Sequence, residues 1–477
     1  MHLSSNKTNA PELHTIPRLP VLERMASMAM QHNFPSQENT AIISVQHLLG
    51  STCSLYQALI NVLKIPSKHI FVSGKCYSTN KQAFSTLQAM GISVTPDISC
   101  FQPGDYSVAR SIVVRQMWND FTRHIEKHKE IENIIVLDEG GLCVREMPEF
   151  IPFQYSVAGI EQTTKGLRGD KVNHLSIPLI NIASCSVKKF VEPELIADAI
   201  LNRVKPLVIN LKSNTKHRYP PVFGVVGCGP IGKAVIRTLL NMGEIVIYFD
   251  EREEASTELR DNLYRTNDLK FLISNTTHIF GCTGEDLTEN KNILGLVTTD
   301  RTFISCSSED IEFRSLLKEI SNSSLETTQS IPDIVYRKST GTTIRILRSG
   351  FPINFDNSLN SVPINDIQLT RGLLLGACMQ ATLVSRKLDD NQLLSSSKQC
   401  LLDPYVQRFI FKTWLKHQSS QTYPQAFIKQ FSDIQWIVEN SGGEFYKNSD
   451  DIKDTPLRNY FDKQKKRLMP IDKVSPL

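Results

Sequence analysis

The chain has 477 residues, of which 40% are hydrophobic and 21% are charged, and its formal net charge is +4. This length predicts two to three globular domains. So small a net charge gives no argument for a nucleic acid or a membrane surface as a partner, and we predict neither. The composition is ordinary for a soluble globular protein.

Cysteine and histidine usage narrows the class further. The ten cysteines are scattered and form no C-x-x-C pair, which is typical of reduced thiols in a cytoplasm. We take none of the eleven histidines as a metal ligand and therefore predict no metal site. The first residues lack an apolar stretch and no run reaches about 18 apolar residues, so we expect neither a secretory signal nor a transmembrane helix. These features favour a cytoplasmic location.

Short apolar runs alternate with amphipathic stretches through the first half of the chain. The runs are bounded by turn residues, and the stretches between them repeat apolar residues at helical spacing. This alternation predicts a parallel α/β sheet. The expected helices are Pro20–Gln31, Thr52–Leu63 and Thr79–Met90, and the expected strands are Thr40–Gln46, His69–Ser73, Ile92–Thr95, Asn133–Leu137 and Leu179–Ala183.

The stretch from Val222 to Asp250 has the pattern of a dinucleotide-binding unit. Gly227, Gly229 and Gly232 form G-x-G-x-x-G between an apolar strand, Val222–Val226, and a helix. Such glycines make a tight turn, let the backbone approach a pyrophosphate, and let the helix pack closely on the strand. The helix N-terminus offers free N–H groups and a positive dipole end to the phosphates. The alternative is a glycine-rich turn in a unit that binds nothing.

An acidic residue points to the identity of the dinucleotide. Asp250 ends the next strand, Ile245–Phe249, 18 residues after Gly232. A carboxylate at this place can accept both ribose hydroxyls of NAD and would repel the 2′-phosphate of NADP. We therefore predict NAD as the cofactor, with NADP as an alternative because Arg252 is close by.

The rest of the chain continues the alternation and then becomes helical. Helix Glu192–Leu211 is expected to link the two halves. The tail contains a basic run, Lys463–Leu468, which is more typical of a solvated face than of a binding site. Further strand–helix units are expected at Leu269–Ile273, His278–Cys282, Thr302–Cys306 and Thr343–Leu347, followed by helices at Ile364–Lys387, Tyr405–His417 and Gln425–Asn440.

Together these patterns predict an α/β protein of two domains with doubly wound parallel sheets. We expect a substrate and catalytic domain at 1–195, and a central Rossmann NAD-binding domain at 196–348 that is inserted between parts of the substrate domain. A return segment with a helix is expected at 349–390, and a helical C-terminal extension at 391–477. Ligands bind such sheets at the carboxyl ends of the strands, so we expect the domains to close over a small molecule.

Six short segments between about residues 40 and 390 also resemble the S-adenosylhomocysteine hydrolase (adenosylhomocysteinase) family. Their order and their spacing towards the glycine pattern are similar to those of the family, and Lys233 follows the glycines as it does there. The segments are Cys76–Asn80 (CYSTN), Val136–Gly141 (VLDEGG), Gly159–Gly166 (GIEQTTKG), Cys185–Glu192 (CSVKKFVE), Phe280–Gly284 (FGCTG) and Gly350–Phe355 (GFPINF).

The resemblance implies a tightly held NAD and a homo-oligomeric enzyme of one-carbon metabolism. Enzymes of that family oxidise the 3′-hydroxyl of the nucleoside ribose, release homocysteine, add water and return the hydride. The expected substrate is S-adenosylhomocysteine or a related nucleoside. By motif position, the resemblance assigns Lys188, Glu192, Glu139 and His47 to catalysis, and adds Thr163, Thr164 and Asn354 to Gly227, Gly229, Gly232 and Asp250 as NAD contacts.

The sequence also departs from the family pattern. Gln162 stands where the family has a carboxylate that grips the ribose, and Leu142 where it has the second aspartate of a loop. Glutamine cannot hold a negative charge, so we expect a changed substrate pocket. Two other interpretations stay open. The protein could be a non-catalytic regulator that binds NAD or a nucleoside, or an NAD-dependent dehydrogenase of the 2-hydroxyacid type, whose cofactor domain would look alike.

Overall fold

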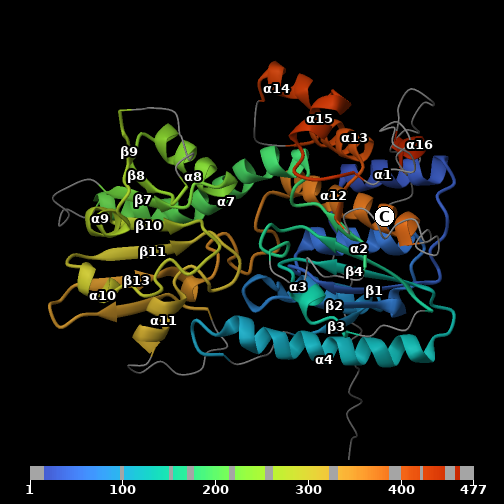
Figure 1. Ribbon diagram of the computed structural model, residues 1–477, viewed down its shortest axis with the longest axis horizontal. Coiled ribbons are helices and arrows are strands. Elements are labelled where there is room, and N and C mark those ends of the chain that lie inside the picture. The colour runs from blue at the N-terminus through green and yellow to red at the C-terminus, as the bar shows by residue number, and fades with distance from the viewer. Residues whose placement is uncertain are drawn as a thin grey trace, which may run out of the picture. The chain divides into compact units, whose positions relative to one another are not determined.

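The computed structural model describes residues 16–96, 101–149, 154–168, 177–213, 221–252, 261–321, 331–385, 399–418, 423–445 and 457–461. The chain divides into two compact units. The first comprises Met1–Pro96, Val114–Ser186 and Asn357–Leu477, and the second comprises Asp97–Val113 and Val187–Asp356. The second unit is therefore an insertion in the first, and the helices α4 (Tyr106–Lys127) and α7 (Ser186–Ser213) begin in one unit and end in the other (Figure 1).

Seven parallel strands form the sheet of the first unit, in the order β14-β6-β5-β4-β1-β2-β3. From β1 the chain builds outwards to β3 on one side, and from β4 it builds outwards on the other. The direction of winding therefore reverses between β1 and β4, and ligands of open parallel sheets bind at such a reversal. The strands are β1 (Thr40–Val45), β2 (Ile70–Ser73), β3 (Ser93–Thr95), β4 (Asn133–Asp138), β5 (Ser156–Glu161), β6 (Leu179–Asn181) and β14 (Gln399–Leu401).

Helices cover both faces of this sheet, which is why its central strands are apolar along most of their length. Every residue of β1 and of β4 is buried. On one face, Trp118 and Phe121 of α4 pack into the core of the unit. On the other face, the Tyr56 hydroxyl of α2 (Gly50–Asn61) donates to Ser44 Oγ in β1 at 2.7 Å. Figure 1 shows α2 and α4 on opposite sides of the strands.

The chain returns to the first unit through α12 (Ile364–Ser385), which packs on α2, on β5 and on α1 (Pro20–Gln31). A β-carbon at Gly372 would lie 2.5 Å from Val21 Cγ1, so glycine allows α12 and α1 to approach closely. Among the described residues, α12 alone is long and apolar enough to cross a membrane. Because 94% of that stretch is buried in the structure, α12 is a core helix.

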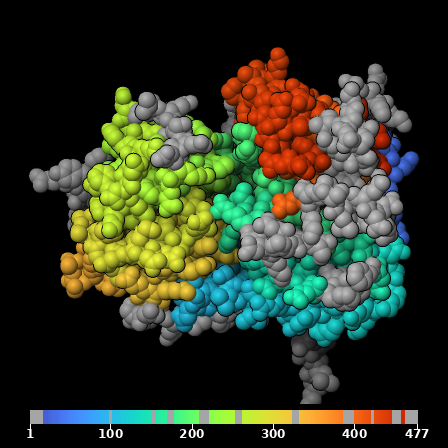
Figure 2. All heavy atoms as spheres, viewed as in Figure 1, coloured from blue at the N-terminus to red at the C-terminus, as the bar shows by residue number. Residues whose placement is uncertain are grey.

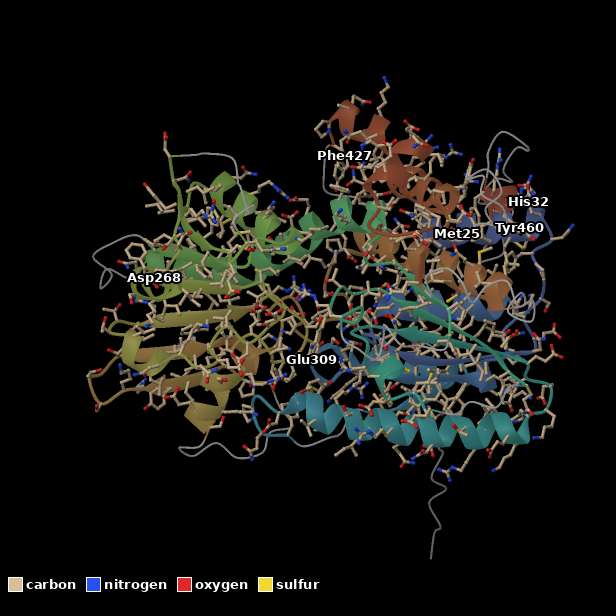
Figure 3. The ribbon with its side chains drawn as sticks, viewed as in Figure 1. Met25, His32, Asp268, Glu309, Phe427 and Tyr460 are labelled. Atoms are coloured by element: carbon tan, nitrogen blue, oxygen red, sulfur yellow. The ribbon has the colours of Figure 1, made fainter. Side chains whose placement is uncertain are left out.

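The other helices of the first unit are α3 (Lys81–Ala89), α5 (Leu142–Arg145), α13 (Pro404–Trp414), α14 (Gln425–Gln430), α15 (Ile434–Asn440) and α16 (Arg458–Phe461), with 3-10 turns η1 (Ser67–His69) and η2 (Cys76–Ser78). The Tyr460 ring of α16 lies edge-on against His32 and Phe34, which follow α1 (Figure 3). Helices α14 and α15 lie at the surface (Figure 2), and no residue of α14 is buried. The basic run Lys463–Leu468 lies outside the described residues.

The second unit repeats this winding. Its sheet has the order β12-β13-β11-β10-β7-β8-β9, with all neighbours parallel except β12 and β13, so the reversal lies between β7 and β10. The strands are β7 (Val222–Val226), β8 (Ile245–Phe249), β9 (Leu263–Arg265), β10 (His278–Gly281), β11 (Arg301–Ser305), β12 (Ile334–Arg337) and β13 (Thr343–Ile346). The helices are α8 (Pro230–Asn241), α9 (Leu269–Asn275), α10 (Ile293–Leu296) and α11 (Arg314–Ser321), with a 3-10 turn η3 (Leu347–Gly350).

The predicted fold class is confirmed: two α/β units with doubly wound sheets, a Rossmann-type unit inserted in the chain, and a helical C-terminal part. Some local elements differ. The run Leu269–Ile273 lies within helix α9, capped by the Asp268 side chain, because a short apolar run looks alike as helix or strand. The sequence does not predict β5, whose apolar run contains Gly159; a β-carbon there would lie 2.7 Å from Leu179 Cδ1. It does not predict the long helix α4 either.

Candidate functional site

The glycine turn lies at the reversal point of the second sheet, between β7 and α8. Gly227 has a φ of +92°, and its N–H donates to the Phe249 carbonyl at 2.8 Å. A β-carbon at Gly232 would lie 1.8 Å from the Gly227 carbonyl oxygen, so the helix can pack on this turn only with glycine. A β-carbon at Gly229 would meet no atom within 4 Å, so the space at the helix N-terminus is open. This is the geometry of a phosphate-binding cradle.

A buried carboxylate, Glu312, holds the loop that follows the neighbouring strand β10. It accepts from Gly284 N at 2.6 Å and from Thr283 Oγ1 at 2.9 Å, and the Ser307 hydroxyl also donates to it. This loop lies directly against the glycine turn, since a β-carbon at Gly227 would lie 2.9 Å from the loop backbone. Burial raises the pKa of Glu312 to about 7. The sequence gives no local signal for this residue.

The raised pKa of Glu312 should make the stability of the protein depend on pH. A free glutamate titrates near 4.5 and folded Glu312 near 7, so between these values the folded state keeps a proton that the unfolded state has lost. The stabilisation is complete below the lower value and is lost as the pH rises through the upper one, by at most about 3 kcal/mol. We would measure the free energy of unfolding in urea at about pH 5 and about pH 8. In Glu312→Gln, the part of its pH dependence that Glu312 causes should be absent. An unchanged slope would contradict the assignment.

Asp250 lies at the end of β8, where the sequence predicts the ribose-binding acid. Its Oδ2 accepts from Cys228 N in the glycine turn at 2.5 Å. Arg252 donates to both oxygens, with Nε 2.9 Å from Oδ1 and Nη2 2.8 Å from Oδ2. These hydrogen bonds, first of all those from Arg252, hold the pKa of Asp250 well below its usual range. The acid is therefore ionised and tied to the turn, with a guanidinium as its immediate neighbour.

Three more predicted site residues belong to the second unit. Asn354 is buried, and the N–H of the residue before it donates to the Ser305 carbonyl at 3.0 Å. It therefore lies at the carboxyl edge of the second sheet. Lys188 and Glu192 form an ion pair one turn apart on α7, and their side chains are 12% and 16% exposed. They share a helix face as the spacing predicts, and their part in catalysis stays a prediction.

In the first unit, three ionisable residues meet at the reversal point of the sheet. His47 follows β1, Lys75 follows β2 and Glu139 follows β4, so parallel strands bring them to the same edge. Glu139 Oε2 lies 2.8 Å from His47 Nε2 and 2.7 Å from Lys75 Nζ. The other ring nitrogen, His47 Nδ1, lies 2.5 Å from Ser78 Oγ. The structure thus brings two predicted catalytic residues together. It also adds Lys75. The only sequence feature that indicates Lys75 as a site residue is its position directly after a strand and before Cys76–Asn80.

Burial and charge set the protonation of this cluster. Burial by itself would raise the pKa of Glu139, but His47 and Lys75 together hold it well below its usual range. Burial is also the largest influence on His47 and lowers its pKa, which Glu139 offsets only in part. At neutral pH His47 is therefore an uncharged imidazole beside an ionised carboxylate. This is the state that a general base with an orienting partner requires.

Two further buried carboxylates, Asp138 and Glu161, hold the loops around the cluster. Asp138 accepts from two backbone N–H groups, each at 2.8 Å. Glu161 accepts from Thr163 Oγ1 at 2.6 Å and from a backbone N–H at 2.8 Å. Burial raises the pKa of both, and the charge of Asp138 raises that of Glu161 further. Thr163 therefore supports Glu161, while Thr164 is exposed. Both threonines lie in the first unit, and their contact with NAD stays a prediction.

Two buried glutamines complete this edge with unsatisfied polar atoms. Gln46 follows β1 and Gln162 follows β5, and they are 0% and 5% exposed. Gln162 Nε2 donates to Gln46 Oε1 at 3.4 Å, while Gln46 Nε2 and Gln162 Oε1 have no hydrogen-bond partner among the described residues. An unpaired buried polar group costs about 1–3 kcal/mol. A free donor beside a free acceptor therefore indicates a place for a polar ligand or ordered water.

The fold is that of an α/β protein of two units, one of which is of the Rossmann type. Each unit has candidate site residues at the carboxyl edge of its sheet. No family model matches the sequence. Two uncharacterised proteins of Mycobacterium tuberculosis, from strains CDC 1551 / Oshkosh and ATCC 25618 / H37Rv, are each 26% identical to this chain over 359 residues. The match covers 72% of this chain, which spans only 65% of the length of these relatives.

Solved structures to which the chain is similar are dehydrogenases. The apo D-lactate dehydrogenase of Escherichia coli is 13% identical with a TM-score of 0.32, over 59% of this chain and 79% of that one. The NAD complex of the D-isomer specific 2-hydroxyacid dehydrogenase of Lactobacillus delbrueckii ssp. bulgaricus is 11% identical with a TM-score of 0.32, over 73% and 99%. The D-lactate dehydrogenase of Aquifex aeolicus, with NAD and lactic acid, is 13% identical with a TM-score of 0.31, over 56% and 86%. A likeness at this level assigns no activity to this chain.

The predicted membership of the S-adenosylhomocysteine hydrolase family is wrong. The solved structures named above are 2-hydroxyacid dehydrogenases, and no family model matches. The site supplies a physical reason, because Gln162 stands where the hydrolase pattern has a carboxylate and is a neutral amide bound to Gln46. Thioether hydrolysis and a place in one-carbon metabolism are therefore not attributed to this chain. Two of these neighbours are NAD complexes.

Proposed function

We propose that this protein is an NAD-dependent dehydrogenase that oxidises the hydroxyl group of a small acid of the 2-hydroxyacid type. In this proposal the second unit binds NAD at the glycine turn, and the first unit binds the substrate at the edge formed by His47, Lys75 and Glu139. The observation that carries the proposal is the His47–Glu139 pair. It is an uncharged imidazole held 2.8 Å from a buried carboxylate at the reversal point of a parallel sheet.

The oxidation of an alcohol needs a base for the hydroxyl proton and an acceptor for the hydride, and NAD supplies the acceptor when it is bound. The hydroxyl proton passes to His47 Nδ1 through the hydroxyl of Ser78, which lies 2.5 Å away. The hydrogen on the same carbon leaves with its electron pair, and a carbonyl remains. Glu139 keeps the ring oriented through Nε2 and stabilises the imidazolium as it forms. In the reverse direction His47 returns the proton.

The charges around His47 favour an acid as the substrate. Lys75 and Arg371 are both buried, and both act electrostatically on His47. Arg371 Nε donates to Ser51 Oγ at 3.0 Å, which fixes the guanidinium beside the start of α2. A carboxylate is the group that buried cations hold most strongly. The free donor of Gln46 is available for a second oxygen of the same ligand.

Two other functions fit fewer of these observations. Ser78, His47 and Glu139 have the hydrogen-bond order of an acyl-transfer triad. Acyl transfer would, however, give no role to the glycine turn of the second unit or to the open space at the start of α8. A regulator that binds NAD without chemistry would have no use for a buried base with an orienting carboxylate.

The proposal is tested by mixing the purified protein with NAD and a panel of small 2-hydroxy acids, simple alcohols and nucleosides. We expect the absorbance of NADH to rise with at least one 2-hydroxy acid, with the matching keto acid found by mass spectrometry. A rise with nucleosides alone would assign a different substrate class. If NAD binds and no panel member yields NADH, the protein is a coenzyme-binding regulator. The predicted homo-oligomeric state and cytoplasmic location are separate proposals, and sedimentation analysis would test the first.

The Asp250–Arg252 pair predicts the coenzyme preference. Because the Asp250 carboxylate is ionised, we expect NAD to bind at least about tenfold more tightly than NADP, whose 2′-phosphate it would repel. Asp250→Asn should shrink this ratio, since Arg252 then remains to attract the phosphate. Arg252→Gln is the matched control and should weaken NADP more than NAD. Calorimetric titration measures both affinities, and an unchanged ratio in Asp250→Asn would mean that this acid does not read the ribose.

A further inference from the structure

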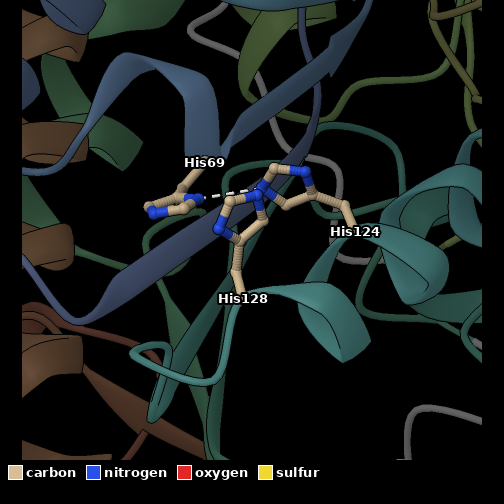
Figure 4. Close-up of side chains that lie close together, drawn as sticks. All are labelled: His69, His124 and His128. Atoms are coloured by element: carbon tan, nitrogen blue, oxygen red, sulfur yellow. Dashed lines mark hydrogen bonds between the residues drawn. The ribbon is translucent and has the colours of Figure 1, made fainter.

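Three histidines of the first unit come together beside the start of β2 (Figure 4). His69 ends η1 just before β2, His124 lies in the last turn of α4, and His128 follows that helix. His69 Nδ1 lies 2.8 Å from His124 Nε2. One ring nitrogen from each histidine lies within 4.8 Å of the other two. The H-x-x-x-H spacing of His124 and His128 is a signal that the prediction of no metal site overlooks.

Glu130 orients two of these rings from outside the cluster. Its Oε1 lies 2.9 Å from His128 Nδ1 and 3.5 Å from His69 Nε2. These contacts leave His128 Nε2 and His69 Nδ1 as the nitrogens for the centre of the cluster. A carboxylate that holds the outer nitrogen of a ring, and so fixes its tautomer, is the usual second partner of a metal-binding histidine. Lys68 also contacts Glu130, at 3.5 Å, but is 61% exposed and can turn to solvent.

We propose that His69, His124 and His128 bind a divalent transition-metal ion of the zinc type, with water in the fourth position. Zinc takes imidazole nitrogens at about 2.0–2.1 Å in a tetrahedron, so the ligand atoms lie about 3.3 Å apart. The present spacings reach this geometry through side-chain shifts of roughly 0.5–1.5 Å.

The position of the cluster assigns it a structural role. His69 precedes β2, so the cluster lies at the amino edge of the first sheet. His47 and Glu139 follow their strands and lie at the carboxyl edge. A metal here would tie the end of α4 to the start of β2 and would take no part in hydride transfer. The proposal is thus independent of the dehydrogenase activity, and either can fail without the other.

The test is titration of Zn²⁺ into full-length protein that carries no histidine tag and has been stripped with a chelator. Calorimetry should show one site of micromolar or tighter affinity in the wild-type chain, and the melting temperature should rise with Zn²⁺. His124→Gln and His128→Gln, both at half-buried positions, should lose this site and the metal-dependent rise. Glu130→Gln should keep the ligands and weaken binding about 10–100-fold.

His417→Gln, which changes a histidine outside the cluster, is the matched control and should bind Zn²⁺ as the wild type does. Because cysteine thiols also bind zinc, the difference between variants decides the outcome, and the total zinc content does not. Melting without metal shows whether each variant folds. The proposal is overturned if the wild type binds no Zn²⁺, or if His128→Gln and Glu130→Gln, shown to be folded, bind it as tightly as the wild type.

Discussion

Replacing His47 by asparagine is expected to slow the formation of NADH by about 10²–10⁴-fold while NAD binds as before. Asparagine is polar and fits the site, but it cannot take up a proton, so the hydroxyl of the substrate has no base. NAD affinity should hold because the glycine turn belongs to the second unit and His47 to the first. Single-turnover absorbance of NADH, with a substrate found by the panel, measures the rate, and calorimetry measures the affinity.

The same pair can be tested from the carboxylate side. Glu139→Gln keeps the size of the side chain but removes the charge that orients His47 and stabilises its protonated form, so we expect a loss approaching that of His47→Asn. The pH–rate profile should also shift, because the pKa of His47 would fall further without this charge. His417→Gln changes a histidine outside the group formed by His47, Lys75 and Glu139. It is the matched control and should keep the full rate. A native rate in His47→Asn would remove His47 from the mechanism.

The second large effect is expected at Gly232. A β-carbon there would lie 1.8 Å from the Gly227 carbonyl oxygen, a backbone atom that cannot yield without opening the turn. Gly232→Ala should therefore lose NAD binding and destabilise the protein by about 1–3 kcal/mol, the usual cost of forcing atoms into a packed site. Equilibrium unfolding in urea measures the stability, and calorimetric titration measures the NAD affinity.

Gly229→Ala is the matched comparison, because a β-carbon at this position would meet no atom within 4 Å. Its stability should stay within roughly 0.5 kcal/mol of the wild type. Its NAD affinity should nevertheless fall at least about tenfold, since the added methyl group would occupy the path of the pyrophosphate. If Gly229→Ala binds NAD as tightly as the wild type, the phosphates do not pass over this residue.

The geometry of the glycine turn could be predicted from the sequence because its signals are local. The strands Val222–Val226 and Ile245–Phe249 form with the predicted bounds, and the three glycines between them have the predicted geometry. Each feature depends on residues within one strand–turn–helix–strand unit. Arg252 is also close in sequence, but its pairing with Asp250 depends on side-chain positions that no spacing rule gives.

The cluster of the first unit could be predicted only in part, because it depends on the order of strands in the sheet. His47 and Glu139 meet because β1 and β4 are neighbours, and Lys75 joins them because β2 lies on the other side of β1. The contact of His69 with His124 likewise joins a strand start to a distant helix. The family assignment failed for a related reason: glycines after strands and acids at strand ends recur in doubly wound sheets of many activities.

The route of the chain through α12 has a consequence for biosynthesis. As the polypeptide leaves the ribosome, the segments of the second unit, which end at Asp356, are all available before Ile364–Ser385 emerges. Until then β5 and α2 lack the helix that packs on them. Nascent chains should therefore pass through a stage with a large uncovered apolar surface, when chaperones bind and aggregation competes with folding.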